Sequence, residues 1–409
     1  MTLAPKTFLP YGRQSIDEDD VAAVVAALRS DYLTTGPRVE QFEAAIAAAT
    51  GAPHAAVCSN GTAALHLAAL ALGMGEGHVA FVPAVTFVAT ANASRYVGAE
   101  VVFTDVDPDS GLMRPRDLEA ALMRAPAQRG AVFPVHLNGQ CVDLEAITAI
   151  ARRAGLKVVE DACHAIGGTL PHRSVAVPVG GCQVSDACAF SFHPVKTITT
   201  GEGGAVTTSN EALSRRIKLL RSHGIERDPA EAVNRTLAFG GEGTANPWYY
   251  ELQELGFNYR ATDFQCALGL SQLAKLPRFV SRRRALSDRY DALLPSLAPI
   301  VLPIARPSAG MPAWHLYPVL IDFDTVGTTR AQLTEHLRVR GVGTQVHYIP
   351  VHHQPYYRQR YGGVDLPGAD RYYARVLSLP LFPAMRDDDV DRVVDSLAQV
   401  LREAKRPRP

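Results

Sequence analysis

The stretch that decides the fold is Ser191-Phe192-His193-Pro194-Val195-Lys196-Thr197-Ile198-Thr199-Thr200-Gly201-Glu202-Gly203-Gly204. The apolar run 187–192 leads into it and predicts a buried strand, and residues 204–208 predict another. Most lysines are solvated, so Lys196 taken alone would be a surface loop residue. The hydroxyl and imidazole groups beside it, and the glycines after it, instead favour a loop that holds a ligand.

Short apolar strands alternate with helices around this stretch. Further strands are predicted at residues 55–58, 79–83, 101–104, 131–135 and 157–160. Helices are predicted at about 16–29, 38–49, 63–72, 144–153, 211–222 and 262–276, the first with a capping box that begins at Ser15. Near-continuous apolar strands that alternate with helices indicate an α/β fold with a mostly parallel sheet covered on both faces.

The chain is long enough for two domains. A large domain is expected over residues 11–277 and a small C-terminal α+β domain over 278–409, with helices at the chain ends bridging the two. The small domain is predicted to contain a strand at 315–323, a helix at 329–340 and a strand at 343–348. Residues 225–250 are rich in glycine, asparagine and charge, and predict a long excursion.

Bulk properties exclude several classes of protein. The 409 residues contain 41 basic and 41 acidic side chains, so no net field attracts nucleic acid. The densest basic run, 278–289, is interpreted as a solvated helix face. The six cysteines have no metal-binding spacing, and neither a signal peptide nor a membrane span is apparent. We expect a cytoplasmic protein with reduced thiols, no metal, no membrane and no nucleic-acid partner.

Three clusters fall where predicted strands end, at the edge where parallel sheets bind ligands. Asn60-Gly61-Thr62 opens a helix whose free N–H groups favour a phosphate, although such residues also serve as ordinary N-caps. Glu160-Asp161 closes a strand, where an acid would cap a helix or pair with a ligand cation. Phe87 is able to cover a flat ring, but a single phenylalanine is more often a core residue.

Together these groups match the requirements of pyridoxal 5'-phosphate. Lys196 supplies an amine to form an imine, and the Glu160-Asp161 pair supplies a carboxylate that keeps a pyridine nitrogen protonated and so improves the electron sink. A helix N-terminus with a hydroxyl holds a phosphate, and an aromatic side chain stacks on the ring. Their joint occurrence, in order along an α/β chain, predicts a pyridoxal-phosphate enzyme.

The chain resembles the DegT-like sugar-nucleotide aminotransferases over nearly its whole length. The resemblance is carried by the lysine stretch and by Ser59-Asn60-Gly61-Thr62-Ala63-Ala64-Leu65-His66-Leu67, Thr86-Phe87-Val88-Ala89-Thr90, Glu160-Asp161-Ala162-Cys163-His164-Ala165 and Gly256-Phe257-Asn258-Tyr259-Arg260. It implies the aspartate aminotransferase fold (fold type I), pyridoxal 5'-phosphate that becomes pyridoxamine 5'-phosphate during turnover, and a homodimer with shared active sites.

The same resemblance implies roles for individual residues. Lys196 is the catalytic lysine, Asp161 the partner of the pyridine nitrogen, and His164 the neighbour of the ring hydroxyl. Phe87 stacks on the ring. The implied phosphate ligands, the last of them from the other subunit, are Gly61, Thr62, Ser191 and Asn258.

A narrower resemblance is to the 4-aminotransferases of pseudaminic acid biosynthesis, carried by residues 11–16, 191–204, 221–225, 315–317 and 346–352. It implies L-glutamate as amino donor and UDP-2-acetamido-2,6-dideoxy-β-L-arabino-hex-4-ulose as acceptor. The implied substrate-binding residues are Tyr11, Asp31, Tyr32, Leu33, Thr34, Asn60, Asn258, His347, Tyr348, Ile349 and Pro350. That subgroup commonly has Ser-Ala-Thr where this chain has Asn60-Gly61-Thr62, which leaves the sugar open.

Three alternatives remain. A 4- or 3-aminotransferase could act on a different UDP-, GDP- or dTDP-keto sugar. A pyridoxal-phosphate sugar dehydratase of the same fold is disfavoured, because histidine replaces the lysine in those relatives and this chain has Lys196. A cofactor-binding regulator without turnover would tolerate loss of the catalytic amine.

Overall fold

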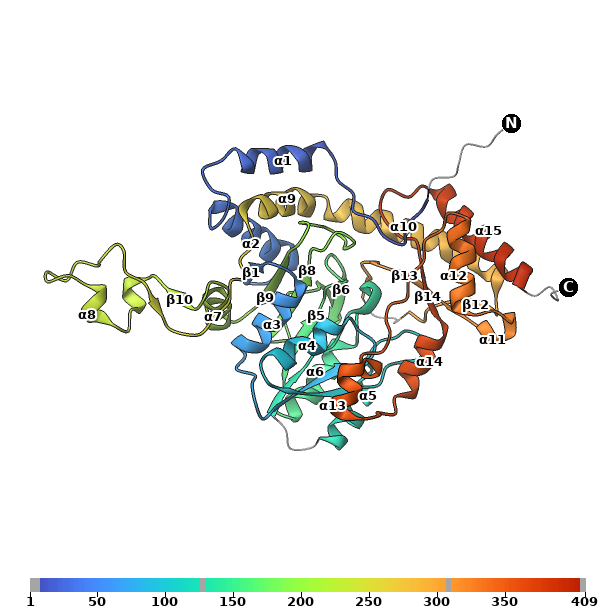
Figure 1. Ribbon diagram of the computed structural model, residues 1–409, viewed down its shortest axis with the longest axis horizontal. Helices are drawn as coiled ribbons and strands as arrows, with labels where there is room; N and C mark the ends of the chain where they lie inside the picture. The colour runs from blue at the N-terminus through green and yellow to red at the C-terminus, as the bar shows by residue number, and fades with distance from the viewer. Residues whose placement is uncertain (1–7, 126–128, 307–309, 405–409) are drawn as a thin grey trace.

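The computed structural model describes residues 8–125, 129–306 and 310–404, and its centre is a seven-stranded sheet (Figure 1). The strand order is β1-β9-β8-β5-β4-β2-β3. These strands are β1 (His54–Cys58), β2 (His78–Pro83), β3 (Glu100–Thr104), β4 (Arg129–Val132), β5 (Lys157–Asp161), β8 (Ala187–Ser191) and β9 (Gly204–Thr208). Strands β3, β2, β4, β5 and β8 are parallel, whereas β9 is antiparallel to β8 and β1. The predicted mostly parallel sheet is confirmed.

Helices bury this sheet, as its apolar strands require. The helices of this part are α1 (Glu18–Leu28), α2 (Pro37–Thr50), α3 (Gly61–Ala71), α4 (Val88–Tyr96), α5 (Pro115–Arg124), α6 (Leu144–Arg153), α7 (Glu211–Arg221) and α9 (Asp263–Ala274). Helix α3 packs across β8 and β9 beside α4 and α7, whereas α5 and α6 pack together against β3 and β5. A short turn η1 (Leu137–Gly139) and a hairpin of β6 (Thr169–His172) and β7 (Val175–Pro178) complete this part.

The C-terminal part is built on a smaller antiparallel sheet. Its strands are β12 (Val301–Pro303), β13 (Tyr317–Ile321) and β14 (Val376–Leu379). Its helices and turns are α10 (Leu276–Leu293), η3 (Leu294–Leu297), α11 (Phe323–Val326), α12 (Arg330–Val339), η4 (Val351–His353), α13 (Pro355–Tyr361), α14 (Pro367–Arg375) and α15 (Asp387–Ala404). Helix α15 packs on α10 and α12.

The division into domains at 11–277 and 278–409 stays a prediction. Pro277 lies in the first turn of α10, and only Lys275 separates α9 from α10. The N-terminal end of the chain joins the C-terminal part, because Leu9 pairs with Val342 in an isolated parallel bridge.

The first helix begins later than predicted, because its capping box uses Asp17 and not Ser15. The carboxylate of Asp17 accepts a hydrogen bond from the Asp20 backbone, and the Asp20 carboxylate accepts one from the Asp17 backbone. Asp20 is buried, and its carboxylate also binds Ser271 and Gln272 of α9. The capping box at Asp17 thus replaces the one predicted at Ser15, and its Asp20 carboxylate is held by α9.

Residues 343–348, predicted to be a strand, form an irregular segment. Gln345 exchanges two backbone hydrogen bonds with Ser378 of β14, at 2.8 and 3.2 Å, and the pairing ends there. The chain then turns toward the large sheet, where the Val351 amide donates to the carbonyl oxygen of Ala84 at 2.7 Å, just past the end of β2. This segment connects the two sheets and does not extend the smaller one.

The basic run 278–289 is not a wholly solvated helix face, because Arg283 is buried. Its guanidinium donates to the carbonyl oxygens of His315 and Leu381 at 3.0 and 2.9 Å. Burial lowers the pKa of Arg283 to about 10. Arg282 and Arg289 of the run are partly exposed, and they form ion pairs with Asp387 and Asp391 of α15.

The excursion predicted at 225–250 is an arm that extends away from the body of the molecule (Figure 1). We define the arm as residues 225–255. Its base is a two-stranded ribbon of β10 (Ile225–Glu226) and β11 (Glu251–Leu252), with η2 (Pro229–Glu231) and α8 (Arg235–Ala238) between them. The arm exposes large apolar side chains, namely Val233, Leu237, Trp248, Tyr250, Leu252 and Leu255.

Two further findings concern the environment of the chain. All six cysteines are free thiols, and five of them are buried. Within residues 8–125, 129–306 and 310–404, every helix is too short or too polar to cross a bilayer.

Candidate active site

Lys196 lies in the loop between β8 and β9, and buried threonines hold this loop in shape. The Thr199 hydroxyl donates to the carbonyl oxygen of Phe192 at 3.0 Å and accepts from the Gly201 amide at 3.0 Å. The Thr200 hydroxyl donates to the carbonyl oxygen of Glu202 at 2.8 Å. These threonines therefore satisfy the backbone of the loop, which fixes the start of the Lys196 side chain.

The Lys196 amine lies close to two other predicted site residues, Asp161 and His164, and to Cys163. Burial lowers the pKa of Lys196, and the neighbouring Cys163 and Asp161 oppose part of that shift. Lys196 in turn acts on His164, since its charge adds to the effect of burial in lowering the pKa of that histidine. A lysine with a lowered pKa gives up its proton more readily and is a better nucleophile or base.

Asp161, at the end of β5, is buried and bound through both carboxylate oxygens. Oδ2 accepts from the Thr90 hydroxyl at 2.7 Å, and Oδ1 accepts from the Cys163 amide at 3.1 Å. A second hydroxyl, that of Thr86, lies 2.7 Å from Thr90 Oγ1. No role was predicted for Thr90 from the sequence; it lies in the first turn of α4, whereas Thr86 precedes the N-cap residue Phe87.

His164 is a buried, neutral imidazole whose tautomer follows from its partners. Nδ1 accepts from the Asn138 amide at 3.3 Å, so we assign the ring proton to Nε2, which donates to the Tyr348 hydroxyl oxygen at 3.1 Å. Burial lowers the pKa of His164 far below its ordinary value. The His315 ring lies 4.4 Å from the His164 ring, centroid to centroid. No sequence pattern indicated a role for Asn138.

His347 and Tyr348 reach this cluster from the C-terminal part. His347 Nδ1 lies 2.8 Å from the Ser378 hydroxyl, and its ring centroid lies 5.3 Å from that of Tyr11. Burial lowers the pKa of His347 to about 3, and the charge of Lys196 is a second, smaller cause of this shift. The Tyr348 ring is 5.9 Å from the half-exposed ring of Phe87. Four predicted residues thus converge from segments far apart in the sequence.

The N-terminus of α3 lies against the end of β8. Asn60 caps the helix, because its side-chain oxygen accepts from the Ala63 amide at 2.8 Å. A Cβ added to Gly61 would lie 2.7 Å from Ser191 Cβ and 3.3 Å from Cys163 Sγ. Gly61 is therefore required for this close approach, which brings the half-buried Thr62 and Ser191 next to the helix N-terminus.

Other predicted residues lie outside this cluster. Residues 31–34 are exposed, and the Leu33 carbonyl oxygen accepts from the Asp263 amide at 3.0 Å, at the start of α9. Asn258 is exposed and pairs through its backbone with Ser222. Among the described residues, no hydrogen bond or ring contact joins these positions to Lys196. In the adjoining segment, Ile349 is exposed and Pro350 is buried.

Residues 14–398 match the DegT/DnrJ/EryC1/StrS aminotransferase family. The chain belongs to this family. Spore coat polysaccharide biosynthesis protein SpsC of Bacillus subtilis is 39% identical over 97% of this chain and 98% of that protein. The family is pyridoxal-phosphate dependent, so the aminotransferase class and the cofactor predicted from the sequence are confirmed for this aminotransferase.

Two solved structures are similar to this aminotransferase along its length. Helicobacter pylori PseC, an aminotransferase involved in pseudaminic acid biosynthesis, has a TM-score of 0.85 and 28% identity, covering 97% of this chain and 100% of its own. The PLP-form of Spr1654, a putative sugar aminotransferase of Streptococcus pneumoniae, has a TM-score of 0.84 and 26% identity, covering 97% and 99%. These likenesses confirm the fold of pyridoxal-phosphate sugar aminotransferases.

Proposed function

We propose that this aminotransferase transfers the amino group of L-glutamate to a nucleotide-linked 4-keto-6-deoxy sugar. The acceptor we favour is UDP-2-acetamido-2,6-dideoxy-β-L-arabino-hex-4-ulose, which would become UDP-4-amino-4,6-dideoxy-N-acetyl-β-L-altrosamine. One observation carries the proposal: the Lys196 amine lies within the electrostatic reach of Asp161 and His164, at the carboxyl ends of parallel strands.

The residues present fit pyridoxal 5'-phosphate. The close approach at Gly61 leaves a helix N-terminus and the Thr62 and Ser191 hydroxyls for a phosphate. Asp161 is a buried carboxylate for the pyridine nitrogen, and Phe87 presents a half-exposed ring for stacking. When bound, the cofactor supplies the carbonyl that accepts the amine and the ring that withdraws electrons.

The protein's own groups divide the remaining work. Nζ of Lys196 removes the proton from Cα of glutamate in the first half of a ping-pong cycle, and returns a proton to C4 of the sugar in the second. Thr90 and the Cys163 amide hold Asp161 in position. Because Nε2 of His164 donates to Tyr348 Oη, the Tyr348 hydroxyl proton is free to be donated elsewhere in the site.

The identity of the sugar has a second candidate. The identity to SpsC, 39%, exceeds that to PseC, 28%, which favours a sugar made for a surface polysaccharide. A 4- or 3-aminotransferase acting on another UDP-, GDP- or dTDP-keto sugar is therefore the alternative. In either case we propose that His347 and Tyr348 contact the acceptor, with Tyr11, Asn60 and residues 31–34 and 349–350.

We further propose a cytoplasmic homodimer in which Asn258 completes the phosphate site of the partner subunit. The apolar arm supports an interface between copies, because large exposed apolar side chains on an extended segment are typical of contact surfaces. Six free thiols support a reducing compartment.

The test is an assay of a panel of UDP-, GDP- and dTDP-linked 4-keto and 3-keto sugars with L-glutamate. We expect formation of 2-oxoglutarate and of a 4-amino sugar from one UDP-linked acceptor, with the configuration at C4 determined by NMR. Lys196→Ala is the control and should lower turnover by more than about 1000-fold. No amination of any panel member, or turnover of the Lys196→Ala variant near wild type, would rule the proposal out.

A further inference from the structure

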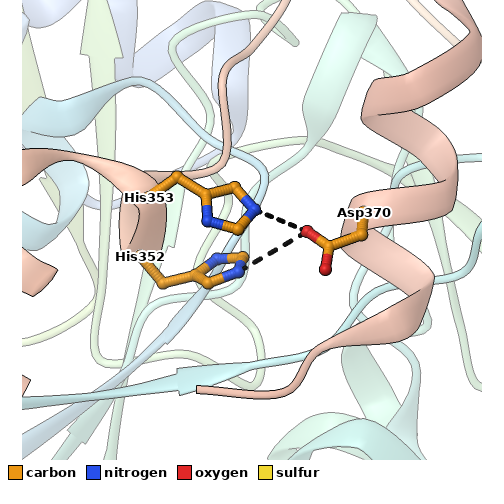
Figure 2. A group of neighbouring side chains, drawn as sticks. All are labelled: His352, His353 and Asp370. Carbon is orange, nitrogen blue, oxygen red and sulfur yellow. Dashed lines mark hydrogen bonds and ion pairs between the residues drawn. The ribbon is translucent and has the colours of Figure 1, made fainter. Parts of the chain in front are cut away.

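Three potential metal ligands meet between η4 and α14, in a group separate from the Lys196 cluster (Figure 2). They are His352, His353 and Asp370, and one ligand atom of each lies within 4.8 Å of the others. The nearest Asp370 carboxylate oxygen is 2.6 Å from His353 Nε2 and 3.6 Å from His352 Nε2. Both imidazoles thus face the same carboxylate oxygen, Oδ1 of Asp370.

The His352 imidazole is unexplained by the rest of the fold. It is 3% exposed, and neither ring nitrogen has a hydrogen-bond partner among the described residues. Its ring contacts are with Phe103, at 6.2 Å, and with His353, at 4.0 Å between centroids. Buried polar nitrogens in native proteins are almost always partnered, so a ligand on His352 Nε2 would supply a partner for one of the two.

The spacing of the three groups suits a small cation. Zinc binds imidazole nitrogen and carboxylate oxygen at about 2.0 to 2.2 Å, which puts the donors of a tetrahedral site roughly 3.3 Å apart. The 3.6 Å separation of His352 and Asp370 is close to that value. The Asp370 side chain is 47% exposed and is therefore free to move the short distance that His353 requires.

The exposure of the group provides a path for entry. The side chains pass from buried to exposed, with His352 at 2%, His353 at 35% and Asp370 at 47%. A cation would therefore bind with its fourth position toward solvent, where water completes the coordination. Two imidazoles and one carboxylate favour a first-row transition ion over magnesium or calcium, which prefer oxygen ligands.

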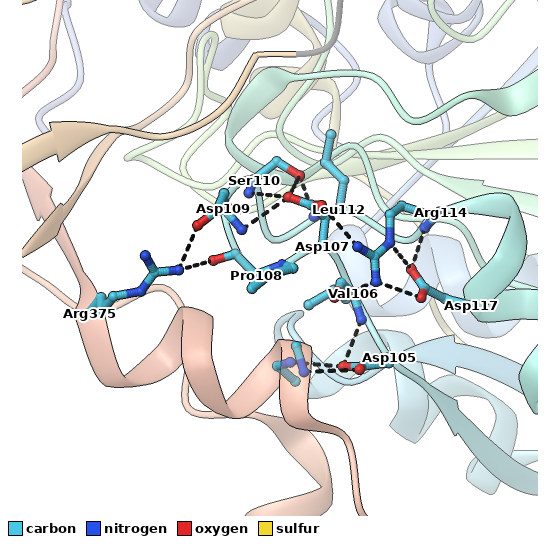
Figure 3. A network of polar contacts seen from close by, with 12 residues as sticks. Asp105, Val106, Asp107, Pro108, Asp109, Ser110, Leu112, Arg114, Asp117 and Arg375 are labelled. Atoms are coloured by element: carbon cyan, nitrogen blue, oxygen red, sulfur yellow. Dashed lines mark hydrogen bonds and ion pairs between the residues drawn. The ribbon is translucent and has the colours of Figure 1, made fainter.

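Helix α14, which carries Asp370, is held independently of the three groups (Figure 3). The Asp105 carboxylate accepts from the Gly368 and Ala369 amides at 2.9 and 2.8 Å, which fixes the first turn. Near the other end, Arg375 donates to Asp109 at 2.7 Å. The η4 turn is likewise anchored, through Val351 to the end of β2. The ligands are thus preorganised by contacts that need no metal.

We propose that His352, His353 and Asp370 form a binding site for one divalent transition-metal ion of the Zn²⁺ class. The ion would join η4 to α14, and η4 directly follows residues 347–350, which contact His164 and Ser378. Its role would be to hold that segment against the large sheet. It would take no direct part in amino transfer.

The experiment titrates the tag-free, full-length protein carrying its cofactor, after chelator treatment, with ZnCl₂ by calorimetry and with CoCl₂ by visible absorbance. We expect one ion per chain, tetrahedral cobalt bands and a rise in Tm on adding zinc. Outer partners of metal ligands are worth about 10- to 100-fold in affinity, so loss of a direct ligand in Asp370→Asn or His353→Gln should weaken binding at least about tenfold.

Matched controls exclude binding elsewhere. His172→Ala removes a surface His–carboxylate pair, with Glu145 at 2.8 Å, and should leave zinc affinity and stoichiometry unchanged. Asp370 and His353 are partly exposed, so their conservative variants should fold, and far-ultraviolet circular dichroism checks this. The proposal is overturned if zinc does not bind, if Asp370→Asn and His353→Gln bind it as tightly as the parent, or if only His172→Ala loses binding.

Discussion

Asp161 illustrates how a single side chain acquires its function from groups on other elements. Its two oxygens are occupied by the Thr90 hydroxyl and the Cys163 amide, so the carboxylate has one orientation in the site. The Lys196 amine lies near enough for the two charges to interact. A carboxylate held in this way stabilises a positive charge without having to reorganise.

Replacing Asp161 with asparagine tests this role. The amide keeps the size and one acceptor oxygen but removes the negative charge, so the electron-withdrawing power of the cofactor ring should fall. We expect kcat to drop by about 100-fold or more. Cofactor affinity, measured by absorbance titration, should change by less than about tenfold. A kcat within about threefold of wild type at saturating cofactor would contradict the assigned role.

His347 makes the stability of the protein depend on pH. Its pKa is lowered to about 3 in the folded protein by burial and by the Lys196 charge, whereas an unfolded histidine titrates near 6.5. Between these values the unfolded chain takes up a proton that the folded chain does not. Stability is therefore lost as pH falls from 6.5 toward 3, by at most about 1.4 kcal/mol per pH unit from this residue.

His347→Gln should remove this dependence. At pH 7 the variant should have a lower Tm than the parent, because the contact with Ser378 is altered. The difference in Tm should narrow as pH is lowered from 7 to 4, since glutamine does not titrate. Scanning fluorimetry across this pH range measures the difference in Tm between variant and parent. His336→Gln, at an exposed position, is the control. A constant or widening difference would show that His347 is not responsible.

At the scale of elements, the junction of α3 and β8 decides where a phosphate binds. The helix N-terminus reaches the strand end because Gly61 has no side chain, and Ser191 then lies beside it. An alanine at this position would require either α3 or Ser191 to shift.

Gly61→Ala should therefore weaken cofactor binding. The added Cβ would lie 2.7 Å from Ser191 Cβ, and relief of that overlap displaces the helix N-terminus from the phosphate position. We expect cofactor affinity to fall by at least about tenfold, or about 1.4 kcal/mol. Fluorescence titration of the cofactor-free protein measures this. Gly363→Ala, where an added Cβ meets nothing within 4 Å, should bind the cofactor normally, and equal effects of both variants would contradict the argument.

At the scale of the whole molecule, one chain leaves part of the predicted site unassembled. Asn258 and residues 31–34 are exposed, and the arm displays apolar side chains to solvent. A second copy that supplies Asn258 would explain why sequence motifs of the site occur at positions that do not meet within one chain. We therefore propose the homodimer because a single chain does not bring these positions to the Lys196 cluster.

Mixing two inactive variants tests this assembly. Lys196→Ala and Asn258→Ala should each be nearly inactive alone, because each removes one contribution to every site. A mixed dimer has one intact site, with Lys196 from one subunit and Asn258 from the other. After random exchange, activity should recover to about a quarter of the wild-type value. No recovery, in a mixture whose exchange is verified by mass spectrometry of the intact dimer, would contradict shared sites.

The sequence by itself determined the α/β class, the positions of the strands of the large sheet and the lysine loop, since these depend on local apolar patterns and on turn residues. Lys196, Asp161, His164 and Gly61 were also predicted from the sequence as site residues, because each lies at or after the end of a strand at the same sheet edge. Such features are encoded within short windows of the chain.

Only the tertiary structure decided which partners these residues have. Thr90 binds Asp161, and the Asn138 backbone binds His164, each from another element. Arg283 is buried in a run whose sequence predicts a solvated face. Residues 343–348 leave their sheet after one pairing, and Val351 then binds the backbone just past the end of β2. Long-range packing sets these outcomes. In each case the two contacting residues are too far apart in the sequence for a short local window to contain both.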